Sequence, residues 1–437
     1  MNPGDPTTPV QRWQDRLFLQ GWTGRLWNLG KLGATVGIAQ VIVQAVAFAS
    51  GILVIRLLPA QEYAFYTLAN TMLGMMTILA DGGIGRGVMA EGGKVWQDSR
   101  RLGSVVATGL RLRKQFAGAS LLFCIPVLLF LLRNNGASWL MASLVSLSVI
   151  PAFVAALYGH LLQVAPKLKQ DLFPIQQIQV ETNTGRLGLT AATLFLFPFA
   201  ALAILCSGIA QVYGNWRLRR VSRGYADWTR EEDPKVRARI LKVVRKMLPE
   251  SIYYCFSGQI TVWLIAVFGS AGAVAQIGAL GRLAAVLGVS LIIFNTLIVP
   301  RFARLPEEKN RLIIRFLQVL GLVGLSGAVA IGLAWLFPAE LLLVLGSNYS
   351  GLEYELSLMI TGSVIHLATG CLFSMNAARA IIVRPSIYIP ATIIVQVLSI
   401  LTFDVSTLTG VILISISVAV VQFGFQLGNF FFAMSKP

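Results

Sequence analysis

Long apolar segments separated by short polar connections fill most of the chain after residue 33. Each is roughly 18 to 27 residues long, and about 20 helical residues cross the ~30 Å hydrocarbon core of a bilayer. The pattern predicts an all-α polytopic membrane protein with about twelve transmembrane helices. We place them at Ala34–Leu57, Phe65–Ile84, Gln115–Leu132, Ser138–Tyr158, Phe173–Phe197, Phe199–Trp216, Glu250–Phe268, Val274–Val299, Leu312–Phe337, Glu353–Met375, Pro385–Phe403 and Leu408–Phe432.

The two halves of the chain share this pattern. Hairpins of similar build run from Arg56 to Met89 and from Phe268 to Pro300, in corresponding places. This indicates a duplication, with two sets of six helices that form two lobes. We expect an interfacial N-terminal segment at 1–32, a first lobe at 33–216, a basic cytoplasmic linker at 217–248 and a second lobe at 249–433. The linker is more simply a solvated segment on anionic lipid than a regulatory or partner site.

Composition supports the membrane assignment. Hydrophobic residues make up 56% of the 437 residues and charged residues 13%, more apolar surface than a soluble globule of this size can bury. The net charge of +17 raises the alternative of a nucleic-acid partner. However, 32 of the 36 Lys and Arg residues fall at one set of alternate connections. By the positive-inside rule, this predicts a multi-pass protein of the cytoplasmic (inner) membrane with both termini cytoplasmic, and no nucleic-acid partner.

Polar side chains inside the apolar segments are the candidates for function, because lipid rejects them. The helix expected at 173–197 has the densest set, which falls on one face at helical spacing. We expect this face to line a water-filled cavity. Its members are Gln176, Gln179, Asn183 and Arg186, with Glu181 beside them.

Each half carries one arginine within an apolar helix, Arg186 in the first and Arg282 in the second. The planar guanidinium donates two parallel hydrogen bonds to phosphate and keeps its charge in a site of low dielectric constant. The two arginines therefore suggest a shared cationic cavity for an anionic head group. The alternative is structural: Arg186 pairs with Glu181, and Arg282 with carbonyls at a helix end.

Five positions elsewhere could line or gate the cavity. Gln40 and Gln44 follow a stripe of small and polar residues on the first helix, which either lines the cavity or forms a packing seam. Asp81 either caps the turn after the second helix or pairs with Arg86, and both are candidates for gating or coupling. His366 is either a hydrogen-bonded packing residue or a group for proton coupling or substrate contact.

Catalytic patterns are missing from the sequence. It contains two histidines and none of the HExxH, GxSxG or Walker A motifs, so we expect no enzyme activity. The four cysteines lie far apart in apolar segments without CxxC spacing, so we expect neither a metal nor a cofactor.

Two motifs in the first hairpin carry a family resemblance. They are the turn RLLPAQEYAFYTL at Arg56–Leu68 and the exit LADGGIG at Leu79–Gly85, with GALGRL at Gly278–Leu283 and LVLGSNY at Leu343–Tyr349 in the second half. The chain thereby resembles the polysaccharide exporters of the multidrug/oligosaccharidyl-lipid/polysaccharide flippase superfamily. The resemblance implies two six-helix lobes around a central cavity, and alternating access. It also implies a polyprenyl-diphosphate-linked oligosaccharide as substrate, for O-antigen or exopolysaccharide biosynthesis.

The resemblance leads to one expected function and leaves two alternatives. We expect a flippase that moves the lipid-linked oligosaccharide from the cytoplasmic to the outer leaflet, working with a polysaccharide polymerase or other assembly proteins. One alternative is an ion-coupled exporter of small molecules or drugs on the same scaffold. The other is a non-transporting membrane scaffold of a polysaccharide assembly complex.

Overall fold

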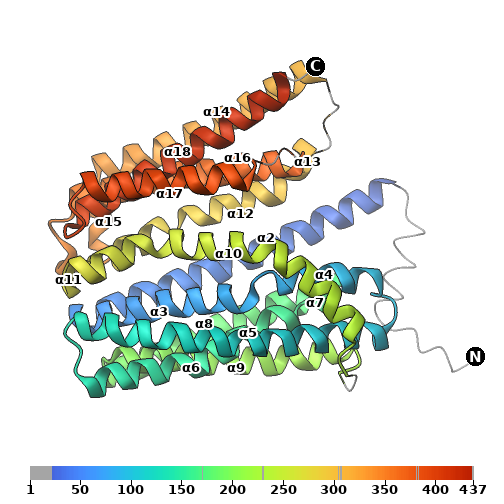
Figure 1. Cartoon of the computed structure of the whole chain (residues 1–437), viewed down its shortest axis with the longest axis horizontal. Helices are drawn as coiled ribbons and strands as arrows, with labels where there is room; N and C mark the ends of the chain where they lie inside the picture. Colours follow the sequence, from blue (N-terminus) through green and yellow to red (C-terminus); the bar gives the residue numbers. More distant parts are fainter. Residues whose placement is uncertain are drawn as a thin grey trace, which may run out of the picture.

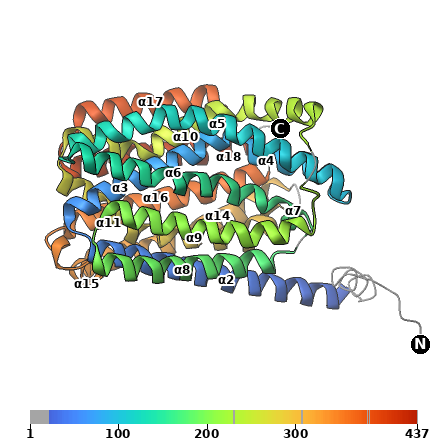
Figure 2. The same cartoon turned by 90° about the horizontal axis from the view of Figure 1, so that it is seen from below.

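The computed structural model describes residues 22–169, 171–228, 231–303, 305, 308–379, 381 and 383–435, and the regular elements in these residues are helices (Figures 1 and 2). The interfacial segment expected at 1–32 lies mostly outside the described residues. The helices are α2 (Trp22–Leu57), α3 (Ala60–Asp81), α4 (Ile84–Lys94), α5 (Ser99–Asn134), α6 (Trp139–Leu162), α7 (Val164–Leu168), α8 (Phe173–Leu196), α9 (Ala200–Arg223), α10 (Pro234–Phe268), α11 (Ala271–Ala284), α12 (Leu287–Leu297), α13 (Val299–Ala303), α14 (Lys309–Leu336), α15 (Pro338–Leu343), the 3₁₀ turn η1 (Ser347–Tyr349), α16 (Glu353–Ala378), α17 (Pro385–Thr402) and α18 (Leu408–Ser435).

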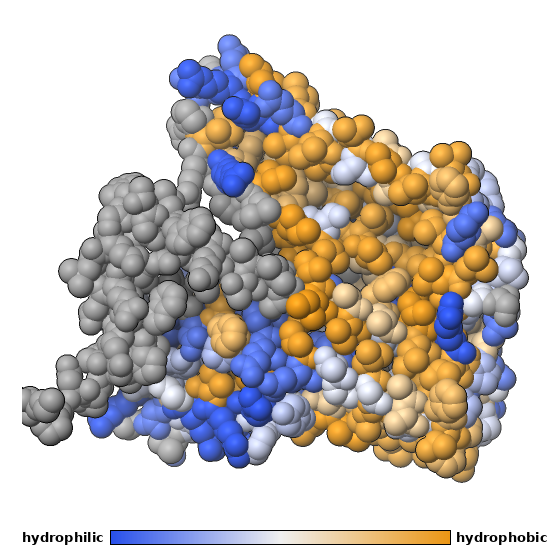
Figure 3. All heavy atoms as spheres, turned by 180° about the vertical axis from the view of Figure 1, so that it is seen from behind, coloured by the Kyte–Doolittle hydropathy of each residue, from blue (hydrophilic) through white to orange (hydrophobic). Residues whose placement is uncertain are grey.

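The expected all-α polytopic fold is confirmed. Among the described residues, nine helical segments are long and apolar enough to cross a membrane. They correspond to nine of the twelve expected spans. The other three fall on α3, α8 and α9, whose polar side chains lower their hydropathy, so the count of twelve stays a prediction. Figure 3 shows a broad hydrophobic band with hydrophilic residues gathered at its two ends, as a bilayer requires.

The two halves pack together at one end of the molecule. A single hydrophobic core there contains Met72 and Leu131 of the first half together with Leu280 and Leu356 of the second. At the opposite end the halves have separate cores, one around α4, α5 and the start of α10, the other around α14, α16 and α18. In Figure 1 the helices converge near α11 and α15 and separate toward α4 and α13. By the expected topology, the shared core lies at the outer end.

Polar contacts also join the halves at the end with the shared core. Arg56 at the end of α2 donates to the backbone carbonyls of Leu343 and Val344, over 2.7 and 3.0 Å. Asn135, which is buried, donates to the carbonyl of Ala266 over 2.9 Å. Each of these bonds connects a residue of the first half to a carbonyl of the second, so together they hold this end closed.

The first part of α10 is packed, although we expected it to belong to a solvated linker. Val236, Ile240 and Val244 recur every four residues and are buried against the first half. On the neighbouring helix α4, Glu91 accepts from Arg239 over 2.5 Å. Burial opposes the ionisation of Glu91, but the hydrogen bonds from Lys94 and Arg239 outweigh it and hold the pKa of this carboxyl below its ordinary value. The basic segment after α9 is therefore fixed to the first half.

A substitution at Gly103 would test how closely this region is packed. A Cβ there would lie 2.0 Å from the carbonyl oxygen of Asp227, whereas a Cβ at Gly118 on the same helix α5 would meet nothing within 4 Å. We expect Gly103→Ala to destabilise the protein by about 1–3 kcal/mol, as overpacking does. Gly118→Ala should be neutral or stabilising, because Ala favours the helix. Thermal unfolding of both variants in detergent checks this, and equal Tm values would contradict it.

Candidate functional site

The two arginines expected in the membrane come together near the closed end. Arg282 on α11 lies against the phenol groups of Tyr63 and Tyr66 on α3, so this contact crosses between the halves. It also passes close to α2, where a Cβ on Gly51 would be 3.4 Å from Cδ of Arg282. Gly51 therefore leaves the space that the arginine side chain occupies.

Arg186 on α8 reaches the same place from the first half, within electrostatic range of Arg282 and Tyr66. Its Nε atom is buried and has no hydrogen-bond partner in the described part of the chain. Neither arginine forms an ion pair with a described carboxylate; the expected alternative partner, Glu181, instead pairs with Arg217 over 3.4 Å. Two half-buried positive charges thus lie within electrostatic range of one another without a carboxylate partner among these residues, which favours binding of an anion.

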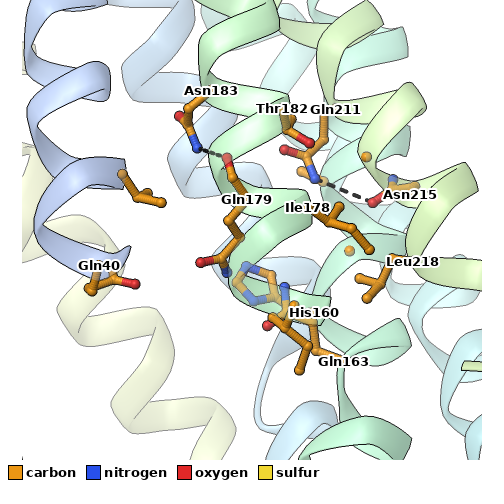
Figure 4. Close-up of a pocket in the computed structure, with 15 residues that line it drawn as sticks. Gln40, His160, Gln163, Ile178, Gln179, Thr182, Asn183, Gln211, Asn215 and Leu218 are labelled. Carbon is orange, nitrogen blue, oxygen red and sulfur yellow. Dashed lines mark hydrogen bonds between the residues drawn. The ribbon is translucent and has the colours of Figure 1, made fainter. Parts of the chain in front are cut away.

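A second polar site lies within the first half. This amide pocket has a volume of about 290 Å³ and opens between α2, α6, α8 and α9 (Figure 4). Of the residues expected at the cavity, Gln40, Gln179 and Asn183 line it. The other polar lining residues are His160, Gln163, Thr182, Gln211 and Asn215, and the apolar ones are Val43, Ala156, Ile175, Ile178 and Leu218, with Gly159 and Gly214.

Sequence reasoning missed the contribution of α6 and α9 to this pocket. Gln211 and Asn215 stand one helical turn apart, and the Gln211 amide donates to the Asn215 side chain over 3.3 Å. Asn215 in turn donates to the carbonyl of Ala155 over 2.5 Å, which fixes its orientation. The spacing of four residues between two amides in an apolar helix was the available signal.

The remaining candidates on α2 and α8 fall outside the described pocket. Gln44 is half-buried on α2, and Gln176 is half-buried on α8 with its Oε1 atom unpartnered in the described residues. The stripe on α2 combines both expected roles, because Gln40 lines the amide pocket while Gly51 makes room for Arg282.

The pairing of Asp81 with Arg86 is wrong. Asp81 caps the turn as expected, since Oδ1 accepts from the backbone of Gly85 over 3.0 Å, but its charged partner is Arg113 on α5. Arg113 is buried and also donates to the carbonyl of Leu157 over 2.7 Å. Arg86 is exposed. The left-handed Gly82 and Gly83, with φ of 45° and 95°, end α3 and turn the chain so that Asp81 faces α5.

His366 on α16 lies away from these sites. Its Nε2 atom is 3.4 Å from the hydroxyl of Ser415 on α18, a contact between two helices of the second half. This geometry matches the packing alternative. A role in coupling stays a prediction.

Comparison with known proteins identifies the fold. No protein-family model and no curated protein sequence matches the chain. Its structure is similar to a multidrug resistance MATE family transporter of the MOP superfamily in an inward-facing conformation, with TM-score 0.64 and 13% identity over 92% of this chain and 96% of that one. A structure titled as the outward-facing conformation of such a transporter gives TM-score 0.57 and 14% identity over 93% and 96%.

A third structure is titled a MOP superfamily transporter from Pyrococcus furiosus whose reversed pocket polarity suggests a different function. It gives TM-score 0.61 and 14% identity over 93% of this chain and 96% of that one. At these identities the likeness establishes the fold: a polytopic helical bundle of the kind found in MATE transporters of the MOP superfamily.

The Asp81–Arg113 pair should matter for stability. Asp81→Ala leaves the buried Arg113 without its carboxylate and should cost about 3 kcal/mol, the low end for buried pairs because the Asp81 side chain is 33% exposed. The double variant Asp81→Ala/Arg113→Met should recover part of the loss, since no buried charge remains unpaired. Arg86→Ala serves as the control and should change Tm little. A loss for Arg86→Ala as large as that for Asp81→Ala would contradict this assignment.

Proposed function

We propose that the chain is a membrane transporter that flips a polyprenyl-diphosphate-linked oligosaccharide from the cytoplasmic to the outer leaflet, for surface or exopolysaccharide biosynthesis. The observation that carries this proposal is the convergence of Arg186 and Arg282, one from each half, at a place with no described carboxylate partner. Two guanidinium groups match the charge and geometry of a diphosphate.

Moving a charged, sugar-bearing head group across a membrane requires a site of this kind. A diphosphate bearing sugars cannot cross ~30 Å of hydrocarbon unaided, because its charges and hydroxyls would lose their hydrogen bonds to water. A protein needs to supply a polar, cationic interior that opens to one side at a time, while the lipid tail stays in the bilayer. Arg186 and Arg282 would hold the phosphates, and the amides of Gln176, Gln179 and Asn183 would meet the sugars or their waters.

Alternating access is supported by how the halves are joined. They share one core at the expected outer end and have separate cores at the cytoplasmic end. The higher TM-score for the inward-facing MATE structure agrees with this arrangement. The moving parts would be the lobes at 33–216 and 249–433. The packing of Val236, Ile240 and Val244 indicates that the first part of α10 moves with the first lobe.

The alternative of a drug exporter has support in the fold, because two structural neighbours are titled multidrug resistance transporters. The charge of the site argues against a cationic drug: Arg186 and Arg282 would repel it, and Glu181 is already paired with Arg217.

A non-transporting scaffold would differ from a flippase in the effect that its loss has on cells. Loss of a flippase leaves lipid-linked oligosaccharide on the cytoplasmic leaflet, whereas loss of a scaffold does not trap it there.

The proposal predicts that Arg282→Ala abolishes flipping. In proteoliposomes containing a polyprenyl-diphosphate oligosaccharide, translocation should fall at least about tenfold, corresponding to 1.4 kcal/mol or more of lost phosphate binding. Arg282→Lys should retain partial activity, because Lys keeps the charge without the planar fork. The measurement is the access of an added lectin to the sugar over time.

Arg315→Ala is the matched control, because Arg315 is exposed on α14 and bonds only the neighbouring Gln318 among the described residues. It should flip at the rate of the unaltered protein. Full translocation by Arg282→Ala, at equal protein level, would refute the assignment.

A further inference from the structure

We propose that the amide pocket is a subsite for one uncharged sugar ring, separate from the arginine pair. The inference rests on the proposed flippase function and deepens it, because it assigns a position and a chemical class to part of the substrate. The pocket belongs to the first half alone, between α2, α6, α8 and α9.

The free polar groups of the pocket point to a ligand. Figure 4 shows Gln179 on α8 extending toward His160, with Gln40 on the facing helix α2. These three side chains come from different helices and line one cavity. None of them forms a hydrogen bond to another described residue. Polar groups that converge without partners are arranged to bind something else.

Thr182 provides independent evidence. It is 9% exposed, lines the pocket, and its hydroxyl oxygen has no hydrogen-bond partner among the described residues. Leaving such a group unsatisfied is unfavourable. The adjacent Gly214 is required by this arrangement, since a Cβ there would lie 2.4 Å from the Thr182 oxygen. The pocket wall therefore contains a buried hydroxyl that has no partner among the described residues.

The lining selects the class of ligand. Amide side chains offer both donors and acceptors, which matches sugar hydroxyls that also donate and accept. The lining contains no Asp, Glu, Lys or Arg, so a charged ring would be buried without a counterion. Apolar side chains such as Ile178 and Leu218 can contact the C–H face of the ring. A volume of about 290 Å³ lies at the small end of ligand sites, which suits one ring rather than a whole oligosaccharide.

The amide pocket and Arg186 lie along the same helix, α8. Gln179, Asn183 and Arg186 lie on one face of α8, and the rise from Gln179 to Arg186 is about two turns, or ~10 Å. A glycan attached to a diphosphate at the arginines can therefore extend along this face into the pocket. Phosphate and sugar would be held by two sites of different chemistry on one helix.

The test uses the full chain in lipid nanodiscs and three probe lipids. These are polyprenyl diphosphate without sugar, the same lipid carrying an N-acetylhexosamine disaccharide, and the same lipid carrying a uronic acid in its place. We expect the unaltered protein to bind the neutral glycolipid about tenfold more tightly than the bare lipid, a gain of about 1.4 kcal/mol. The uronic acid lipid should lack this gain.

Gln179→Leu and Thr182→Val should each reduce the preference for the neutral glycolipid to less than about threefold, a loss of roughly one hydrogen bond. Their affinity for the bare lipid should not change. The controls are Gln177→Leu, at an exposed position of α8, and Thr190→Val, at a buried position of α8 outside the pocket. Both should keep the full preference.

The outcomes separate this inference from the proposed function. Equal binding of all three lipids by the unaltered protein, or an unchanged preference in Gln179→Leu and Thr182→Val, would overturn the sugar subsite alone. If the controls lose the preference to the same extent, the effect is not specific to the pocket and the inference is also refuted. Failure of the unaltered protein to bind any of the lipids, or unchanged binding of the bare lipid by Arg282→Ala, would refute the flippase proposal and the inference with it.

Discussion

The hydrocarbon interior of the membrane gives polar side chains no water, and this constraint orients the helices around both candidate sites. On α8, Gln179, Asn183 and Arg186 turn toward the bundle, while Phe195 and Leu196 on the same helix are exposed. Within the membrane, the polar side chains on one face of a helix can form hydrogen bonds only with other polar groups or with a ligand. The packing of α8 on α2 and α9 follows from this requirement, and it creates the amide pocket and brings Arg186 to the boundary between the halves.

Arg282 connects binding to the relative position of the two halves. It belongs to the second half, yet it lies against the phenols of Tyr63 and Tyr66 in the first, at the end where the halves share one core. Any movement that opens this end must separate the guanidinium from the phenols. Under the proposed function, an anion at Arg282 would compete with the phenols for the same N–H donors. The contact that would receive the phosphate is therefore also one of the contacts that join the halves at this end.

The sequence predicts the fold class and the helices well, because apolar length and spacing are set by the bilayer and need no knowledge of partners. Helical spacing also predicts that Gln179 and Asn183 line a cavity and leaves Gln40 between cavity lining and packing; in the structure all three line the amide pocket. The sequence could not assign Arg113 to Asp81, because that contact depends on how the left-handed Gly82 and Gly83 aim the chain. The sequence likewise could not predict that α6 and α9 contribute to the pocket, because tertiary packing decides which helices are neighbours.

The basic linker expected at 217–248 contains a signal for the start of a helix, Asp-Pro. Asp233 accepts from the backbone of Lys235 over 2.8 Å, and Pro234 fits the first turn because its missing N–H would be unpaired there. The helix then docks on the first half through Ile240 and continues into the core that both halves share. Pro249 lies inside α10 between these two regions. Because proline removes one backbone hydrogen bond, α10 bends most easily there, so this helix, which contributes to both cores, has its weakest point between them.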